Sequence, residues 1–465
     1  MSFMKSLFRV KSAHHETHHQ NTLRKCLTAT DLTLLGIGAI IGAGIFVLTG
    51  IAAATKAGPA IIFSYILASF ACGFSALAYA ELAASVGGCG SAYGYAFAGI
   101  GEFIAWIIGW DLLLEYSMVV STVSIGWGSY LQNALQAIGI TLPARLLTDP
   151  FHGGMMNLPP ALIILLLASV LTAGAKQSAR FNQLIVYTKL FVIAIFIAIA
   201  LFHFDIQNWK PFLPFGLQGI VNGAGLIFFA YIGFDAVSTA AEETINPGRD
   251  LPRGIMASLL ICTVTYAIVS ALLTGMIHYP QLNVSSPVST ALLSFGYRFA
   301  ASIVSIGAIA GLTTVILVMF YGFTRVFLAM ARDGLLPNLF VKIDTKRQTP
   351  NRLIWFIAII MAFIAGFIPI NEVANLTNIG TLSAFVAVCC SVVVMRYTKP
   401  DMKRPFKTPY SPYLPILGAG LCLYLMSSLP AVTWISFGIW TAIGLIIYFA
   451  YSRHNSVARM VCAES

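Results

Sequence analysis

Long apolar segments separated by short polar ones dominate the chain. Twelve of them approach or exceed the roughly 20 residues that a helix needs to cross a bilayer. They span about residues 31–54, 60–85, 101–128, 159–174, 183–204, 217–241, 254–277, 299–328, 353–369, 374–395, 413–429 and 431–451. The pattern predicts an all-α polytopic membrane protein with twelve transmembrane helices.

The first apolar segment carries four glycines between Gly36 and Gly44. Glycine weakens a helix interior by about 1 kcal/mol relative to alanine, and backbone groups released in hydrocarbon need polar partners. The run therefore predicts a discontinuous helix, broken at Gly42–Gly44, whose free backbone groups hold a solute. The alternative is close helix packing, because Gly38 and Gly42 form a pair of small residues four positions apart.

A second interruption is expected in the sixth segment, where Gly223, Gly225 and Gly233 precede Asp235. Segments one and six each open a block of five, and an odd number makes the second block enter the membrane from the opposite side. This layout predicts a five-plus-five inverted repeat with broken helices 1 and 6. Paired interruptions of this kind indicate the binding site of a secondary transporter.

The predicted domain organisation follows from these blocks. Residues 1–29 form a cytoplasmic N-terminal tail without the long apolar core of a cleavable signal peptide. Residues 30–396 form the transport core, with 30–204 and 215–396 as its halves. Residues 397–451 hold helices 11 and 12, and residues 452–465 form a cytoplasmic C-terminal tail.

Composition and charge fit this organisation. The 465 residues are 58% hydrophobic and only 9% charged, which excludes the soluble classes. Of the 27 lysines and arginines, 21 lie on the side that carries both termini and four on the other. The positive-inside rule then predicts cytoplasmic termini in the plasma (inner) membrane. The net charge of +10 is explained as an orientation signal, so no nucleic acid partner is expected.

Five motifs, in order and on the expected segments, resemble the amino acid–polyamine–organocation (APC) superfamily and its cationic amino acid transporter-like branch. The resemblance covers about residues 25–450 and implies amino acid transport by alternating access on the five-plus-five fold. The motifs are Ile41–Phe46, Gly109-Trp110-Asp111 with Glu115, Phe228–Asp235, Asn246-Pro247 with Arg249–Pro252, and Arg332–Pro337.

The resemblance assigns the backbone of the amino acid to the two breaks. A half-helix that starts after a break presents amides and a positive dipole end, which suit a carboxylate. Half-helices that end at a break present carbonyls, which suit an ammonium group. The implied carboxylate site is Gly42, Ala43, Gly44 and Ile45. The implied ammonium site is Ile40, Ile41, Phe229, Ala230 and Ile232.

Four further side chains complete the expected site. Phe228 or Phe229 could close over the solute as a gate, with ordinary membrane packing as the alternative. Met319 resembles a pocket-lining position, and its bulk favours a small or medium neutral amino acid. Glu115 shares a helix face with Asp111 and is the one argument for a cationic solute. Either carboxyl could instead be hydrogen-bonded to a neighbouring helix.

Lys189 is the least expected residue in the apolar segments, because a lysine deep in a membrane helix costs roughly 2.5–3.5 kcal/mol. When buried, it can release its proton. Lys189 resembles the lysine that replaces sodium in proton-coupled relatives. The resemblance puts it near the carbonyls of Gly38 and Ile41 and the hydroxyl of Thr313 or Thr314. A structural ion pair and snorkelling to an interface are the alternatives.

Together these features predict a secondary active transporter that couples neutral amino acids to protons by symport. The alternatives are an amino acid exchanger and a transporter of cationic amino acids or polyamines. An enzyme is not expected, because no histidine lies in the middle of a segment. The proton is the expected coupling ion, with no cofactor or metal. The expected partners are the amino acid and the lipid bilayer, and a small single-span subunit stays open.

Overall fold

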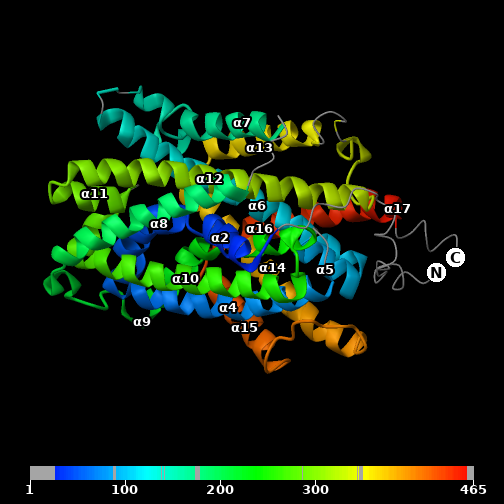
Figure 1. The fold of residues 1–465 in the computed structure, drawn as a ribbon. Coiled ribbons are helices and arrows are strands. Elements are labelled where there is room, and N and C mark those ends of the chain that lie inside the picture. The colour runs from blue at the N-terminus through cyan, green and yellow to red at the C-terminus, as the bar shows by residue number, and fades with distance from the viewer. Residues whose placement is uncertain are drawn as a thin grey trace.

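Helices make up almost all of the structure, a computed structural model that describes residues 27–86, 91–137, 139–140, 142–172, 179–284, 286–342, 344 and 349–457 (Figure 1). In these residues there is no β-strand, and one isolated bridge joins Leu27 to Thr244. Eight helical stretches within them are long and apolar enough to cross a bilayer, and four shorter apolar helices accompany them. The chain is therefore a polytopic membrane protein.

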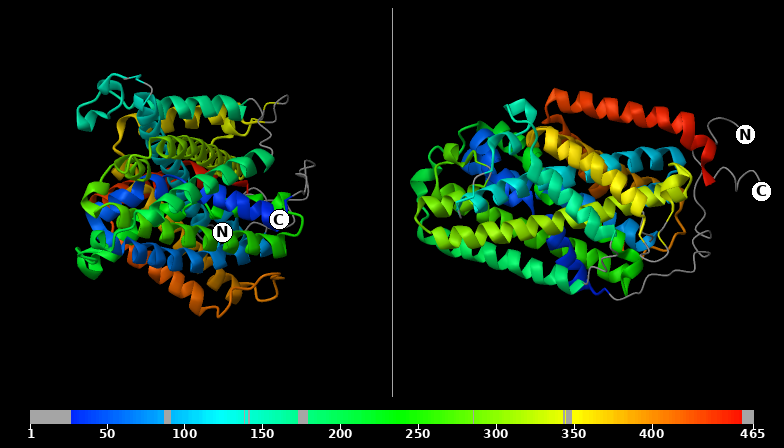
Figure 2. Two further views of the ribbon diagram at one scale, coloured as in Figure 1. Left: turned by 60° about the vertical axis from the view of Figure 1, so that its left-hand side comes forward. Right: turned by 90° about the horizontal axis from the view of Figure 1, so that it is seen from above.

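The long helices lie side by side along a common direction (Figures 1 and 2). The six longest are α4 (Ile61–Ser85), α6 (Glu102–Ala137), α8 (Ala179–Phe202), α10 (Pro247–Met276), α12 (Arg298–Arg332) and α14 (Ile370–Thr398). Shorter helices are α2 (Ala29–Ile40), α5 (Ser91–Gly99), α7 (Leu158–Thr172), α9 (Gly216–Ile227), α11 (Pro287–Ser294), α13 (Asn351–Phe367), α15 (Tyr413–Ser427), α16 (Ala431–Ile447) and α17 (Arg453–Asn455). At the centre, α6 packs along α12 and α4 along α10. The pair α7 and α13 covers one side of the bundle, and α15 lies on the opposite side (Figure 1).

The first predicted break is present, but it begins before the predicted position. Helix α2 starts with a capping box between Thr28 and Asp31 and ends at Ile40. Ile41 is extended, with φ −72° and ψ 101°, and the chain resumes as a π-helix over Gly44–Leu48. Short helical turns then continue to α4 through α3 (Thr49–Ala52), Ala53–Ala57 and Gly58–Ala60.

The second break lies where the glycines predict it. Helix α9 passes into a 3₁₀ helix over Phe228–Tyr231, which ends at an extended Ile232 with ψ 135°. Gly233 follows with φ +118°, a conformation that side chains rarely allow. A second 3₁₀ helix, Asp235–Glu243, then leads to α10. Both interruptions therefore leave helix ends, with their free backbone groups, in the interior of the bundle.

Three tryptophans hold α16 against α6. The indoles of Trp110 and Trp440 stack with centroids 4.4 Å apart, and each donates to the backbone carbonyl of the other, at 2.8 and 3.2 Å. Trp106 adds a 3.0 Å hydrogen bond to the carbonyl of Gly444. Seen from above, α16 lies along one edge of the bundle (Figure 2). This aromatic contact with α6 adds to the packing of α16 against α14.

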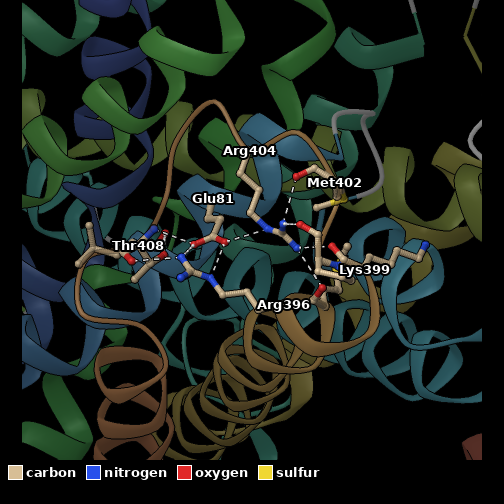
Figure 3. Close-up of polar contacts among 9 residues, drawn as sticks. Glu81, Arg396, Lys399, Met402, Arg404 and Thr408 are labelled. Atoms are coloured by element: carbon tan, nitrogen blue, oxygen red, sulfur yellow. Dashed lines mark hydrogen bonds and ion pairs between the residues drawn. The ribbon is translucent and has the colours of Figure 1, made fainter.

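A buried carboxylate fixes the connection between α14 and α15. Glu81 of α4 accepts hydrogen bonds from Arg396 at 3.1 and 2.7 Å and from the Thr408 amide at 2.7 Å (Figure 3). Arg404 lies 3.6 Å from the same carboxylate. Its guanidinium also donates to four carbonyls at the end of α14 and just beyond it. These belong to Met395, Lys399, Pro400 and Met402.

Arg404 thus caps the carbonyl end of α14, where a cation is favoured, and its removal provides a test. We expect Arg404→Gln to destabilise the protein by roughly 2–4 kcal/mol, because hydrogen bonds to charged groups contribute about 1.5–3 kcal/mol each. The measurement is the melting temperature of the purified protein in detergent.

Lys403→Gln is the matched control, since it removes one positive charge from the adjacent, exposed position. Its melting temperature should equal that of the wild type within error. An equal fall in both variants would contradict the capping role.

Candidate functional site

The two breaks meet each other backbone to backbone. A Cβ atom added to Gly44 would overlap the Cα and Cβ of Ala230. A Cβ on Gly233 would meet the carbonyl of Ala39 and the methyl group of Met319. The glycines therefore allow the two unwound stretches to contact each other directly. They also allow Met319 of α12 to lie against Gly233.

Lys189 donates to the end of α2. Its side chain is fully buried, and Nζ lies 2.8 Å from the carbonyl oxygen of Gly38 and 2.9 Å from that of Ile41. Its aliphatic stem lies against Gly311 of α12, where a Cβ would displace it. The ammonium group therefore lies at the negative end of the α2 dipole, where a cation is stabilised.

The expected hydroxyl partners of Lys189 are turned to other groups. Thr313 accepts from the Trp127 indole at 2.9 Å, and Thr314 donates to the carbonyl of Gly311 at 2.7 Å. No salt bridge joins Lys189 to a carboxylate in the part of the chain that the structure describes. A structural ion pair and a snorkelling lysine are thus both wrong for this conformation.

Tyrosine hydroxyls satisfy other carbonyls of the first break. Tyr266 of α10 donates to Ile40 at 2.9 Å, and Tyr130 of α6 donates to Phe46 at 2.7 Å. The carbonyl of Gly44 accepts from the Thr49 hydroxyl at 3.0 Å. The carbonyl of Ile40, at the end of α2, therefore receives from α10 a hydrogen bond that the break would otherwise leave unmade.

The second break is satisfied in the same way. The Asn378 amide of α14 donates to the carbonyls of Gly225 and Leu226, at 2.9 and 3.2 Å. Tyr266, which already contacts the first break, lies 2.9 Å from the carbonyl oxygen of Ala230. Sequence reasoning missed both donors. The available signal was a polar side chain inside an apolar segment, but its partner could not be read from the chain.

Four of the five carbonyls expected to bind an ammonium group already lie within hydrogen-bond distance of a donor. Ile41 accepts from Lys189 and Phe229 from the amide of Ile232 at 3.3 Å, while Ile40 and Ala230 share the one hydroxyl proton of Tyr266. A carbonyl oxygen has two lone pairs, so each can accept one more donor.

Three buried carboxyl groups begin at the second break: Asp235 follows it in the chain, and Glu115 lies near both Asp235 and Asp111. Asp111 accepts from the Ser383 hydroxyl at 2.9 Å, which is the hydrogen bond to a neighbouring helix considered above. Asp235 accepts from Tyr116 at 2.9 Å. Burial of carboxyl groups without compensation is costly, so this region is a candidate for binding protons or cationic groups.

The remaining predicted residues occupy different surroundings. Phe228 packs edge-to-face on Phe385 of α14, with centroids 5.7 Å apart. Phe229 is buried at the second break, 4% exposed. Ile45 lines a small apolar cavity together with Phe46 and residues of α8 and α10. Gly42 and Ala43 lie between the end of α2 and the π-helix.

Comparison with known proteins identifies the family. A family model described as amino acid permease matches residues 27–452, which is nearly the whole chain. The chain belongs to the amino acid permease family. The APC resemblance is thereby confirmed, and the permease is a transporter and not an enzyme.

Two relatives of the permease match along nearly their whole length, and a third matches over part of its own. The methylthioribose transporter of Bacillus subtilis (strain 168) is 47% identical over 458 residues, covering 98% of this chain and 99% of its own. The branched-chain amino acid permease BcaP of the same organism is 48% identical over 459 residues, covering 97% and 98%. Cationic amino acid transporter 4, vacuolar, of Arabidopsis thaliana is 36% identical over 387 residues, covering 82% and 64%.

The contact between the two breaks can be tested with one methyl group. Gly44→Ala should lower the stability of the permease by about 1–3 kcal/mol, as added bulk does in a packed core, because the backbone of Ala230 cannot give way. The measurement is the melting temperature in detergent.

Gly438→Ala, on α16, is the control, since nothing lies within 4 Å of its added Cβ. This variant should keep the wild-type melting temperature. A Gly44→Ala protein as stable as the control would mean that the breaks can separate freely.

Proposed function

We propose that this permease is a secondary active transporter that couples a neutral amino acid to a proton by symport and alternating access. The single observation that carries the proposal is the buried Lys189 ammonium group, which donates to Gly38 and Ile41 at the end of α2. By family resemblance, a coupling cation acts at this position. A covalently attached cation that can gain and lose a proton would serve the same purpose.

The coupling step follows from helix electrostatics. A charged Lys189 is attracted to the negative end of α2, and a neutral amine is not. Loss of the proton therefore weakens the link between α8 and α2. Protonation of Lys189 and the position of α2 are then linked. The charged amine favours the position of α2 in which its carbonyls contact Lys189, and that position in turn favours the charged amine.

A neutral solute is supported by Met319. This bulky apolar side chain is fully buried against Gly233 of the second break. The relative named branched-chain amino acid permease is consistent with such a solute. Of the two phenylalanines, we assign the gate to Phe229, because Phe228 is held in an aromatic contact with Phe385. A cationic solute is the second candidate, favoured by Glu115 and Asp235.

We further propose twelve membrane helices arranged as a five-plus-five inverted repeat. Each apolar segment has a helical counterpart, and corresponding helices of the halves pack together: α4 with α10, α6 with α12, and α7 with α13. Such pairing is expected around a pseudo-two-fold axis in the membrane plane. The basic residues favour cytoplasmic termini in the plasma (inner) membrane. No cofactor is required, and the sequence leaves open whether a small single-span subunit accompanies the permease.

Transport by purified protein in proteoliposomes tests the coupling. We expect an inward proton gradient, without sodium, to drive uptake of radiolabelled leucine or alanine and not of arginine. Lys189→Ala should abolish the gradient-driven component, because the proton-binding cation is lost. Lys56→Ala, at an exposed lysine, should transport as the wild type does.

Three results would each overturn a part of this scheme. Uptake that ignores the gradient but needs amino acid inside the vesicles would mean an exchanger. Gradient-driven uptake that survives in a folded, monodisperse Lys189→Ala protein would remove Lys189 from the coupling step. Arginine as the preferred label would establish the cationic alternative.

The orientation has its own test. In a background without exposed native thiols, a membrane-impermeant maleimide applied to intact cells should label Phe151→Cys, whose native side chain is 77% exposed. Lys403→Cys should react only after the membrane is opened, because the positive-inside rule puts this basic loop in the cytoplasm. The reverse pattern would mean the opposite orientation.

A further inference from the structure

Tyr266 touches both broken helices at once. Its side chain is fully buried on α10, and its hydroxyl oxygen lies 2.9 Å from the carbonyl oxygen of Ile40 and 2.9 Å from that of Ala230. One carbonyl is at the end of the first half-helix and the other is at the second break. No other side chain described above bonds to both breaks.

The two carbonyl oxygens have a spacing that an ammonium group could bridge. Because each lies 2.9 Å from the same hydroxyl oxygen, they are at most twice that distance apart. Hydrogen bonds from a cationic nitrogen to oxygen are about 2.7–2.9 Å long. A single nitrogen could therefore reach both oxygens at once, as the tyrosine oxygen does.

The tyrosine alone cannot satisfy both carbonyls. A hydroxyl carries one proton, so it donates fully to Ile40 or to Ala230 at any moment. The other carbonyl oxygen then faces the tyrosine oxygen with no proton between the two atoms, so it has no hydrogen bond from Tyr266. An ammonium group has three N–H donors, and each carbonyl oxygen still has a lone pair for it. The pair of carbonyls is thus left incomplete by Tyr266 and would be completed by a cationic nitrogen.

The ring of Tyr266 is held in place by two other tyrosines. Its centroid lies 5.3 Å from that of Tyr65 and 5.4 Å from that of Tyr231. Tyr231 donates to the carbonyl of Tyr65 at 3.0 Å, and the Tyr65 hydroxyl lies 2.5 Å from that of Thr49. The hydroxyl of Tyr266 is therefore presented from a rigid cluster.

We propose that Tyr266 is the positioning residue for the α-ammonium group of the solute. It holds the carbonyls of Ile40 and Ala230 at a fixed spacing from the α10 side, and the ammonium group binds their remaining lone pairs. This role rests on the proposed amino acid transport. In this scheme the preference for a solute with an amino group depends on α10 as well as on the two breaks.

The test compares two ligands that differ only at the amino group. Leucine and its 2-hydroxy acid analogue, 2-hydroxy-4-methylpentanoate, compete with radiolabelled leucine for binding to the purified protein. In Tyr266→Phe we expect leucine to bind about tenfold more weakly and the hydroxy acid to change less than twofold. The preference for leucine should thus fall about tenfold.

Tyr231→Phe is the matched control, since it removes a hydroxyl from the same cluster that does not contact either Ile40 or Ala230. Its preference should equal that of the wild type even if its melting temperature falls. If empty Tyr266→Phe protein is unstable, it is purified with leucine, whose ammonium group supplies the missing donor. Tyr266→His, which keeps an N–H donor, should retain more of the preference.

The outcomes separate this role from the proposed function. An unchanged preference in Tyr266→Phe, or an equal loss for both ligands, would make Tyr266 purely structural while leaving amino acid transport intact. Wild-type protein that binds neither ligand would overturn the proposed function, and this role with it.

Discussion

Backbone carbonyls that lose their helical partners inside an apolar bundle must find other hydrogen-bond donors. The positions of the buried polar side chains around the two breaks follow from that requirement. The breaks after Ile40 and at Ile232 are possible because Lys189, Tyr266 and Asn378 supply those donors. The three residues come from α8, α10 and α14. The unwound stretches therefore fix the mutual positions of helices that are distant in sequence, and the same groups define the candidate site of the permease.

Two buried cations use the same helix-end electrostatics with different surroundings. Arg404 closes the carbonyl end of α14 and also lies beside Glu81, so its charge is compensated twice. Lys189 closes the end of α2, and among the described residues no carboxylate forms a salt bridge with it. The first arrangement suits a permanent structural contact. The second leaves the charge dependent on its proton, which is why we propose it as the coupling element.

The sequence predicted the helical class and both interruptions, because glycine runs inside apolar segments are local signals. The contact of Lys189 with Gly38 and Ile41 followed from the family resemblance, since a lone lysine in a segment does not reveal its partners. The first break was expected too late, since Gly44 serves the close approach to Ala230 and not the bend itself. Tyr266 and Asn378 were missed because their partners lie in other segments. Only the packed bundle brings such donors to a carbonyl.

Gly44 and Ala230 meet with no layer of side chains between them. Side chains can change rotamer and absorb a displacement, whereas main-chain atoms in contact cannot. The two unwound stretches are therefore mechanically coupled. If one of them shifts, the other must shift with it, or a void opens between them. A solute bound across both stretches would then occupy a site whose shape is set by main-chain atoms. The backbone itself would limit the size of the solute.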